Sequence, residues 1–221
     1  MIKIENVLVQ GWEPAIRGMR NAMNSWDKSD SRFKLGGCEG ESCSNCELYP
    51  CYEYYVGDND LDLMKKLAKA GSDHRKFMRM IVVYVDITAP LYWWKEADTY
   101  KVGTVMNSCS TMHKIHERDL TMDDNSKDQL EESNVFAIKH FVNRLNVMRE
   151  MYIKNNNKHW WYQMIQLLPS SYNQRRTWML NYEVLRNIYH ARKNHKLDEW
   201  REFCKWIETL PYSELITGGE E

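Results

Sequence analysis

Hydrophobic and polar residues alternate over the first ten positions of the chain, a period of two that predicts a β-strand. A second apolar run, at residues 80–87, contains several Val and Ile residues and is apolar on both faces, which is typical of a central strand. Residues 176–180 form a third strand-like run. These runs predict a small sheet built from segments that lie far apart in the sequence.

Spacings of three and four residues between apolar positions predict helices over much of the remaining chain. In the clearest helix, at residues 136–154, one apolar stripe is formed by Ile138, Phe141, Leu145, Met148 and Tyr152. Another helix is expected to start with Asp60 as its N-cap and to end at Gly71. Further helices are expected at residues 90–100, 160–168, 182–193 and 198–210. The pattern predicts an α+β fold, with several helices packed on a small, mostly antiparallel sheet.

Polar segments separate these elements. Residues 24–31 are expected to form a loop, and the acidic stretch 117–132 a loop or a mobile insertion. The length of 221 residues fits a single domain over residues 1–221. Within it we expect a Cys-rich insertion at residues 36–55 and a core at residues 61–210.

Composition narrows the classes of function. The chain is 43% hydrophobic and 28% charged, with a formal charge of −1, so non-specific nucleic acid binding and attraction to a membrane surface are not expected. The N-terminus lacks the long apolar run of a signal peptide or a membrane-spanning helix, so we expect a cytoplasmic protein with no membrane partner. Nine Trp, thirteen Tyr and thirteen Met indicate an aromatic core packed with Met, or alternatively a pocket that stacks on planar rings.

Four cysteines follow one another closely, in the pattern C-x4-C-x2-C-x4-C. They are Cys38, Cys43, Cys46 and Cys51. Four thiolates in fourteen residues can surround a tetrahedral zinc ion, and an iron–sulfur cluster uses the same ligands. The alternative is reduced thiols that bind no metal. A metal here would stabilise the loop rather than take part in chemistry.

A compact polar cluster, Asn107, Cys109 and Ser110, follows apolar Val105 and Met106. Because Asn107 and Ser110 are three residues apart, a helical turn would place them together. A Ser hydroxyl acts as a nucleophile when a base or a strongly activated electrophile assists it. The alternative is that Ser110 caps a helix.

The helix expected at residues 182–193 carries a second polar set. Asn181 and Arg192 are eleven residues apart, close to three turns, so they project from nearly the same face as Leu185 and Ile188. An Arg at the end of an apolar stripe needs an acceptor, which would be a ligand or, alternatively, a carboxylate such as Glu183 or Asp198. Asn187 lies off this face and is available to a second ligand.

Taken in their order along the chain, these residues and the predicted elements around them resemble the flavin-dependent thymidylate synthases over residues 61–205. The resemblance rests on the spacing of Asn107, Ser110, Leu168, Pro169, Asn181, Asn187 and Arg192. It implies a homotetramer with active sites at subunit interfaces, which binds FAD and a pyrimidine nucleotide, dUMP. It also implies that the one-carbon unit comes from methylene-tetrahydrofolate.

The resemblance implies roles for individual residues. Ser110 would be a catalytic residue beside the pyrimidine, and Arg192 a catalytic residue that also binds the nucleotide. Asn107 and Cys109 would bind the substrate. The residues implied on the cofactor side are His74, Tyr100, Lys101, Asn181 and Asn187. Cys109 would be a nucleophile toward C6 of the ring if Lys101 or His113 favoured its thiolate; alternatively, it packs as a small buried side chain.

The chain departs from the family signature where positive charge is expected. In place of ArgHisArg it has Tyr100, Lys101 and Val102, so one cation remains there. The other departures are Val105 for a Ser, Met112 for an Arg, and Ile165 and Gln166 where an Arg precedes LeuPro. Each lost charge-assisted contact to a phosphate forfeits about 1.5–3 kcal/mol. The candidate replacements, otherwise solvated surface residues, are Arg17, Arg20, Arg75, Arg79, Arg175 and Arg176.

The leading hypothesis is a divergent protein of this kind that methylates C5 of dUMP with folate, either with or without FAD. Without flavin, water would capture the methylene group and give a hydroxymethyl product. The non-enzymatic alternative is a nucleotide-binding or interaction protein on a degenerate thymidylate synthase fold.

Overall fold

The computed structural model describes residues 2–35 and 52–218, and the chain divides into two compact units. Unit 1 consists of Met1–Val7, Tyr84–Met179 and Asn194–Phe203. Unit 2 consists of Leu8–Val83, Leu180–Lys193 and Cys204–Glu221. The single domain and its core at residues 61–210 stay predictions, and most of the expected insertion at residues 36–55 lies outside the described residues.

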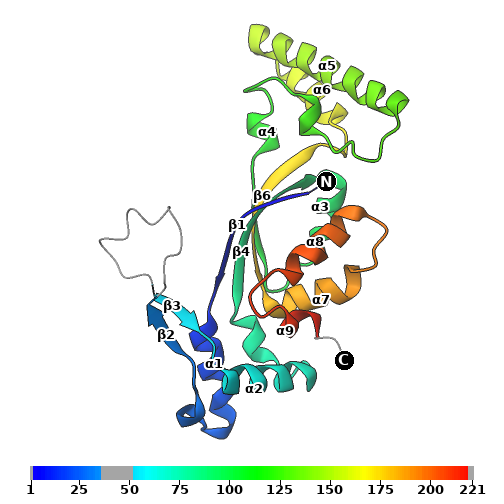
Figure 1. Ribbon diagram of the computed structural model, residues 1–221. Helices are drawn as coiled ribbons and strands as arrows, with labels where there is room; N and C mark the ends of the chain where they lie inside the picture. The colour runs from blue at the N-terminus through cyan, green and yellow to red at the C-terminus, as the bar shows by residue number, and fades with distance from the viewer. Residues whose placement is uncertain (1, 36–51, 219–221) are drawn as a thin grey trace. The chain divides into compact units, whose positions relative to one another are not determined.

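A four-stranded sheet has the strand order β1, β4, β6, β5 (Figure 1). Its strands are β1 (Lys3–Gln10), β4 (Val82–Pro90), β5 (Val105–Ser108) and β6 (Asn173–Asn181). β5 runs antiparallel to β6, with Val105 opposite Met179 and Ser108 opposite Arg176. The predicted α+β class with a small, mostly antiparallel sheet is confirmed. β4 occupies the central position that its apolar sequence predicts.

Unit 1 contains an aromatic core beside its sheet. Its helical elements are α3 (Leu91–Ala97), α4 (Thr111–Lys114), the 3₁₀ turn η6 (Met122–Asp124), α5 (Glu132–Asn155), α6 (Lys158–Leu167) and the first part of α8 (Asp198–Glu208). The fully buried rings are those of Trp93, Trp94, Trp178, Trp200 and Phe203. The ring centroids of Trp93 and Trp200 are 4.7 Å apart. The aromatic-core interpretation is confirmed for these side chains.

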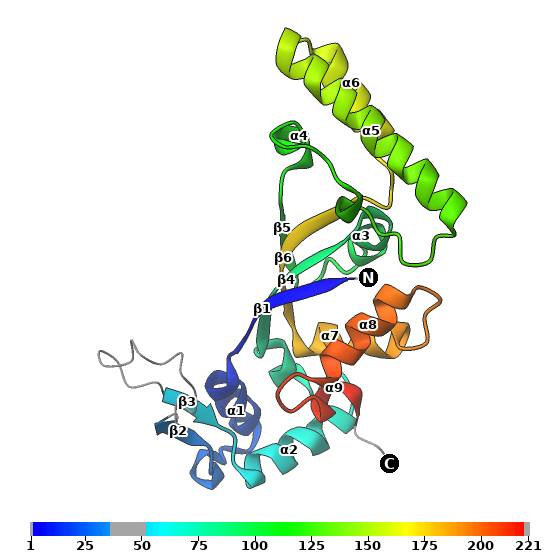
Figure 2. The same ribbon diagram turned by 45° about the horizontal axis from the view of Figure 1, so that its top comes forward.

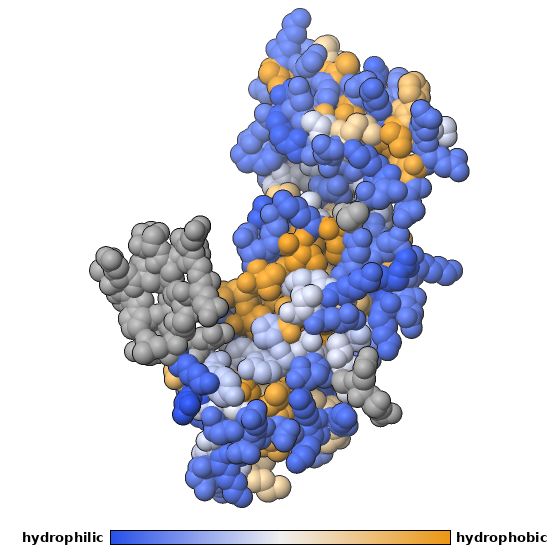
Figure 3. All heavy atoms as spheres, viewed as in Figure 1, coloured by the Kyte–Doolittle hydropathy of each residue, from blue (hydrophilic) through white to orange (hydrophobic). Residues whose placement is uncertain are grey.

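Helices α5 and α6 lie side by side (Figures 1 and 2). Their contact buries Leu145 and Met148 of α5 with Met164 of α6. The predicted apolar stripe was wrong in one position, because Phe141 is 43% exposed while its neighbour Val142 is buried. Figure 3 shows hydrophobic side chains at the surface over this helix pair. The helix is therefore less strictly amphipathic than its sequence spacing predicts.

Unit 2 is mainly helical. Its elements are α1 (Trp12–Arg20), η1 (Asn21–Met23), η2 (Trp26–Lys28), β2 (Arg32–Leu35), β3 (Tyr52–Tyr55), α2 (Asp58–Lys69), η5 (Lys76–Arg79), α7 (Tyr182–Arg192) and α9 (Glu214–Thr217). β2 and β3 pair as an antiparallel hairpin, and α7 packs against α9. The unit's buried residues include Met64, Tyr182, Leu185 and Ile188.

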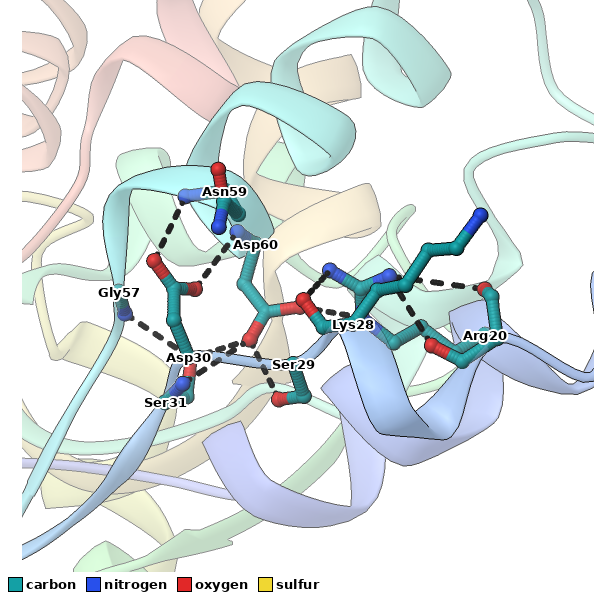
Figure 4. A network of polar contacts seen from close by, with 9 residues as sticks. Arg20, Lys28, Ser29, Asp30, Ser31, Gly57, Asn59 and Asp60 are labelled. Atoms are coloured by element: carbon teal, nitrogen blue, oxygen red, sulfur yellow. Dashed lines mark hydrogen bonds and ion pairs between the residues drawn. The ribbon is translucent and has the colours of Figure 1, made fainter.

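A buried ion pair joins α1 to α2 in unit 2 (Figure 4). The Arg20 guanidinium donates to Asp60 over 2.6 Å, and the hydroxyls of Ser29 and Ser31 donate to the same carboxylate over 2.6 Å each. Asp60 is fully buried. The prediction that Asp60 caps the helix was wrong, because α2 starts at Asp58 and Gly57 is its N-cap. Asp60 instead supplies the negative charge that a buried Arg requires.

A second buried carboxylate lies in unit 1. Tyr92 donates a hydrogen bond to Glu199, which is buried, and its hydroxyl also lies 3.2 Å from the Ser126 hydroxyl. Burial, together with the hydrogen bond to Glu199, raises the pKa of Tyr92 to about 12. The phenol therefore stays protonated at neutral pH and continues to donate to the carboxylate.

Tyr92→Phe should lower the free energy of unfolding by about 1–3 kcal/mol, because Glu199 loses a donor while remaining buried. The measurement is the midpoint of urea unfolding. Tyr162→Phe, on the exposed side of α6, is the matched control and should change the midpoint little. Equal midpoints for both variants would contradict the expectation.

Candidate functional site

The segment after β5 is held in place by contacts with the start of β6, all within unit 1. The Cys109 amide donates to the Arg175 carbonyl over 3.0 Å. The side-chain amide of Gln174 donates to the Cys109 carbonyl and to the Thr111 hydroxyl, each over 3.1 Å. Gln174 is buried, so both of its contacts are made away from bulk water. Sequence reasoning missed Gln174, since a single Gln at the start of a strand carries no periodic signal.

A cavity of about 360 Å³ lies beside this segment. It is lined by Leu91, Ser108, Cys109, Ser110, Thr111, Met112, Ile165, Leu168 and Gln174. We call it the serine cavity. Apolar side chains and a few hydroxyl, thiol and amide groups form its wall, a combination typical of small-molecule sites. None of these lining residues carries a charge.

Cys109 and Ser110 both lie in the wall of the serine cavity, and their roles toward a substrate stay predictions. The expected helical turn between Asn107 and Ser110 was wrong, because Asn107 lies on β5 and Ser110 precedes α4. The Ser110 hydroxyl accepts from the His113 amide over 3.2 Å, which confirms the capping interpretation. No group in residues 2–35 or 52–218 accepts a hydrogen bond from its own O–H. Cys109 is exposed, so the interpretation of a buried packing residue was wrong.

The predicted residues of α7 lie in unit 2. Asn181 is the N-cap of α7, where its side-chain oxygen accepts from the Val184 amide over 3.0 Å. Leu185 and Ile188 are fully buried, as predicted for the inner face of this helix. Asn187 is exposed. Asn181 therefore has a structural role beside the one that the resemblance implies.

Arg192 occupies the last turn of α7 and is half-buried. Burial raises the pKa of the Cys204 thiol to about 12, and the positive charge of Arg192 opposes this shift. Glu183, one of the carboxylates expected to pair with Arg192, forms an ion pair of 2.9 Å with Arg75. The role of Arg192 toward a nucleotide stays a prediction.

Of the remaining residues predicted on the cofactor side, one packs against another side chain and the others are exposed. Tyr100, in unit 1, places its ring edge against Trp200, with centroids 6.0 Å apart. Lys101 is exposed in the following turn. His74, in unit 2, is exposed in the turn after α2. Lys101, His74 and Asn187 are the predicted cofactor residues whose side chains are open to a ligand.

Four of the six arginines proposed as replacement cations form close ion pairs with carboxylates within their own unit. The pairs, with N–O distances of 2.6–2.9 Å, are Arg20 with Asp60, Arg75 with Glu183, Arg175 with Asp86 and Arg176 with Asp98. Arg17 lies 3.5 Å from Glu13, and Arg79 is exposed. Those four charges are therefore partly neutralised inside the protein, which makes them weaker candidates for a phosphate.

The predicted metal ligands Cys38, Cys43, Cys46 and Cys51 lie outside the described residues. Within residues 2–35 and 52–218, no group of three or more His, Cys, Asp or Glu side chains is arranged to hold a metal ion. The zinc or iron–sulfur site stays a prediction. No helix in the same ranges is long and apolar enough to span a membrane.

Comparison with known proteins identifies the fold. No protein-family model and no curated protein matches the chain. Thymidylate synthase X (ThyX) from Helicobacter pylori, solved with FAD and dUMP, matches with a TM-score of 0.67 and 16% identity, covering 99% of this chain and 98% of its own. A UMP/dUMP methylase, PolB from Streptomyces cacaoi, solved with 5-Br dUMP, matches with a TM-score of 0.59 and 13% identity, covering 99% and 95%. At these identities the likeness shows a shared fold, that of flavin-dependent thymidylate synthase.

Proposed function

We propose that the chain binds a uridylate-type pyrimidine nucleotide in the serine cavity and transfers a one-carbon unit to C5 of the ring. The cavity itself carries this proposal, because Ser108 to Met112, which line it, belong to the segment that resembles the nucleotide-binding signature. Its hydroxyl groups complement the carbonyl and N–H groups of a uracil, and Leu91, Ile165 and Leu168 complement the ring faces. The fold shared with proteins solved with dUMP or 5-Br dUMP supports the same ligand class.

Two side chains of the cavity have chemical roles in this proposal. Ser110 donates its free O–H to a ring carbonyl and so polarises the ring. The Cys109 thiolate adds to C6, which forms an S–C6 bond and makes C5 nucleophilic. C5 then attacks the methylene carbon of methylene-tetrahydrofolate, and loss of the C5 proton and of tetrahydrofolate leaves an exocyclic methylene group. That folate is the donor stays a prediction.

The fate of the methylene group depends on the second reactant. Reduced FAD, if bound, would supply a hydride for conversion of the methylene group to a methyl group, and the Cys109 thiolate would leave C6. Lys101 is the accessible cofactor-side residue of unit 1, the unit that contains the serine cavity, and would contact FAD there. The cofactor roles of His74 and Asn187, in unit 2, stay predictions. We propose methyl transfer as the first candidate reaction, and the homotetramer implied by the resemblance stays a prediction beside it.

Hydroxymethyl transfer is a second candidate, and residues 100–112 favour it. They contain one Lys and no Arg, and Tyr100 packs against Trp200, so this segment offers a single cation to the phosphates of FAD. Water then adds to the methylene carbon and loses a proton while the Cys109 thiolate leaves C6 and the C5=C6 bond re-forms, which gives a hydroxymethyl group with no external oxidant or reductant. The product mass distinguishes the two candidates.

Calorimetry with dUMP and mass spectrometry of the product test the proposal. Ser110→Ala should weaken dUMP binding by about 1 kcal/mol, roughly fivefold. Cys109→Ser should retain binding and lose product formation, because a hydroxyl is a much weaker nucleophile than a thiolate. Ser133→Ala, exposed on α5, is the control. Absence of dUMP binding would contradict the proposal; binding without any product would favour the non-catalytic alternative.

A further inference from the structure

A nucleotide in the serine cavity presents an electrostatic problem, since its phosphate carries one to two negative charges. The lining of that cavity is uncharged, with Met112 and Ile165 at positions where the resembled family has Arg. A phosphate without a counter-charge or donors binds poorly, because its desolvation is not compensated. A nucleotide ligand therefore needs positive charge at a position just outside this cavity.

A second cavity of unit 1, about 320 Å³ in volume, has that character. Its lining includes three basic side chains, His113, His116 and Lys158, together with Asn156. His113 and Lys158 are exposed, and the Lys158 ammonium lies 5.3 Å from the centroid of the Tyr162 ring. The Nδ1 atom of His116 is buried and has no hydrogen-bond partner among the described residues. We call this the basic cavity.

The two cavities adjoin. Met112 lines both, and the indole of Trp161 in the basic cavity donates to the Met112 carbonyl over 2.8 Å. Along α6, Trp161 and Ile165 are one helical turn apart and line the two cavities in succession. Lys158 and Ile165 are separated by about 10 Å along the helix axis. An elongated ligand with an uncharged ring at one end and an anion at the other matches this arrangement.

The local electrostatics favour an anion in the basic cavity. α6 has ten residues and begins at Lys158, so its positive N-terminal end lies beside Asn156 and Lys158. Two acidic residues that lie near this cavity in sequence have their own partners, since Glu117 pairs with Lys114 and Asp119 with Arg149. The positive charge of Lys158 is therefore supplemented by the helix end rather than neutralised by these acids.

We infer that the basic cavity binds the 5′-phosphate of the nucleotide whose ring occupies the serine cavity. Lys158 and His113 supply charge-assisted hydrogen bonds to the phosphate, and the positive end of the α6 dipole adds to their attraction. This inference rests on the proposed function and names the residues that replace the missing arginines. It also explains why the uncharged serine cavity, which would hold the ring, adjoins the basic cavity.

Calorimetry with dUMP and with deoxyuridine, which lacks the phosphate, tests this inference. Lys158→Gln should weaken dUMP binding roughly tenfold or more and leave deoxyuridine binding unchanged. His113→Asn should weaken dUMP binding in the same selective way. Lys154→Gln, exposed in the last turn of α5 and outside the cavity lining, is the matched control and should change neither affinity. Inorganic phosphate should compete with dUMP and not with deoxyuridine.

The outcomes separate the inference from the proposed function. If Lys158→Gln changed neither dUMP binding nor deoxyuridine binding, the phosphate site alone would be overturned. An equal loss of both ligands in Lys158→Gln would also overturn it, because the effect would not follow the phosphate. Failure of the unaltered protein to bind either ligand would overturn the proposed function, and the phosphate site with it.

Discussion

Asp60→Asn should lower the free energy of unfolding by about 3–5 kcal/mol, since it removes one partner of a buried ion pair and leaves the other charge uncompensated. Asp60 and Arg20 are both buried and lie 2.6 Å apart. Arg20 also donates to the carbonyls of Ser25 and Lys28, so its loss of a counter-charge disturbs the loop between α1 and β2 (Figure 4). The measurement is the free energy of unfolding from urea titration followed by circular dichroism.

Two further variants isolate the ion pair. Asp58→Asn changes the same charge in the first turn of the same helix, but at an exposed position, so its effect should be at most about 1 kcal/mol. The double variant Arg20→Met/Asp60→Leu should recover much of the stability lost in Asp60→Asn, because no unpaired charge remains buried. A loss in Asp60→Asn no greater than that in Asp58→Asn would contradict the expectation.

The same carboxylate has a defined pH dependence. Burial alone would raise the pKa of Asp60, but the hydroxyls of Ser29 and Ser31 and the Arg20 guanidinium lower it further than burial raises it. A lowered folded-state pKa means that the stabilisation is present above the pKa of the unfolded chain and is lost as pH falls through the folded-state pKa. The difference in stability between the unaltered protein and Asp60→Asn should therefore shrink on acidification.

Met112→Arg should tighten dUMP binding by about 10- to 150-fold, the equivalent of one charge-assisted contact of about 1.5–3 kcal/mol. Met112 is 51% exposed and lines both cavities, so a longer, charged side chain fits at their junction without burying an unpaired charge. The added guanidinium would offer a planar pair of donors to a phosphate. Calorimetry with dUMP measures the change.

Deoxyuridine and a neutral variant provide the controls for this gain of charge. Met112→Gln adds a polar side chain without charge and should leave dUMP affinity nearly unchanged. Deoxyuridine should bind Met112→Arg and the unaltered protein equally, since it has no phosphate. If Met112→Arg tightened both ligands to the same extent, the gain would come from contacts to the ring or sugar and would contradict the expectation.

Helices and strands whose hydrophobic residues recur with a regular period could be predicted from the sequence. The stripe of residues 182–193 became α7 with Leu185 and Ile188 buried, and the two-sided apolar run at residues 80–87 became most of the central strand β4. Helix α1 and the short strand β5 were missed. The α1 sequence contains Pro14 and Gly18, which read as helix breakers, and β5 has four residues, too few for a period to show.

The amino-acid sequence by itself determined the α+β class, the main helices and the order of the anchor residues, because these depend on local periods and on spacing along the chain. Only the tertiary structure decided the role of Asp60, whose partner Arg20 lies forty residues away. The tertiary structure also creates the serine cavity, which is lined by Ser110 together with Ile165 and Gln174 from distant segments. Burial and pairing arise from contacts between residues far apart in the chain, and neither composition nor periodicity specifies which of those contacts form.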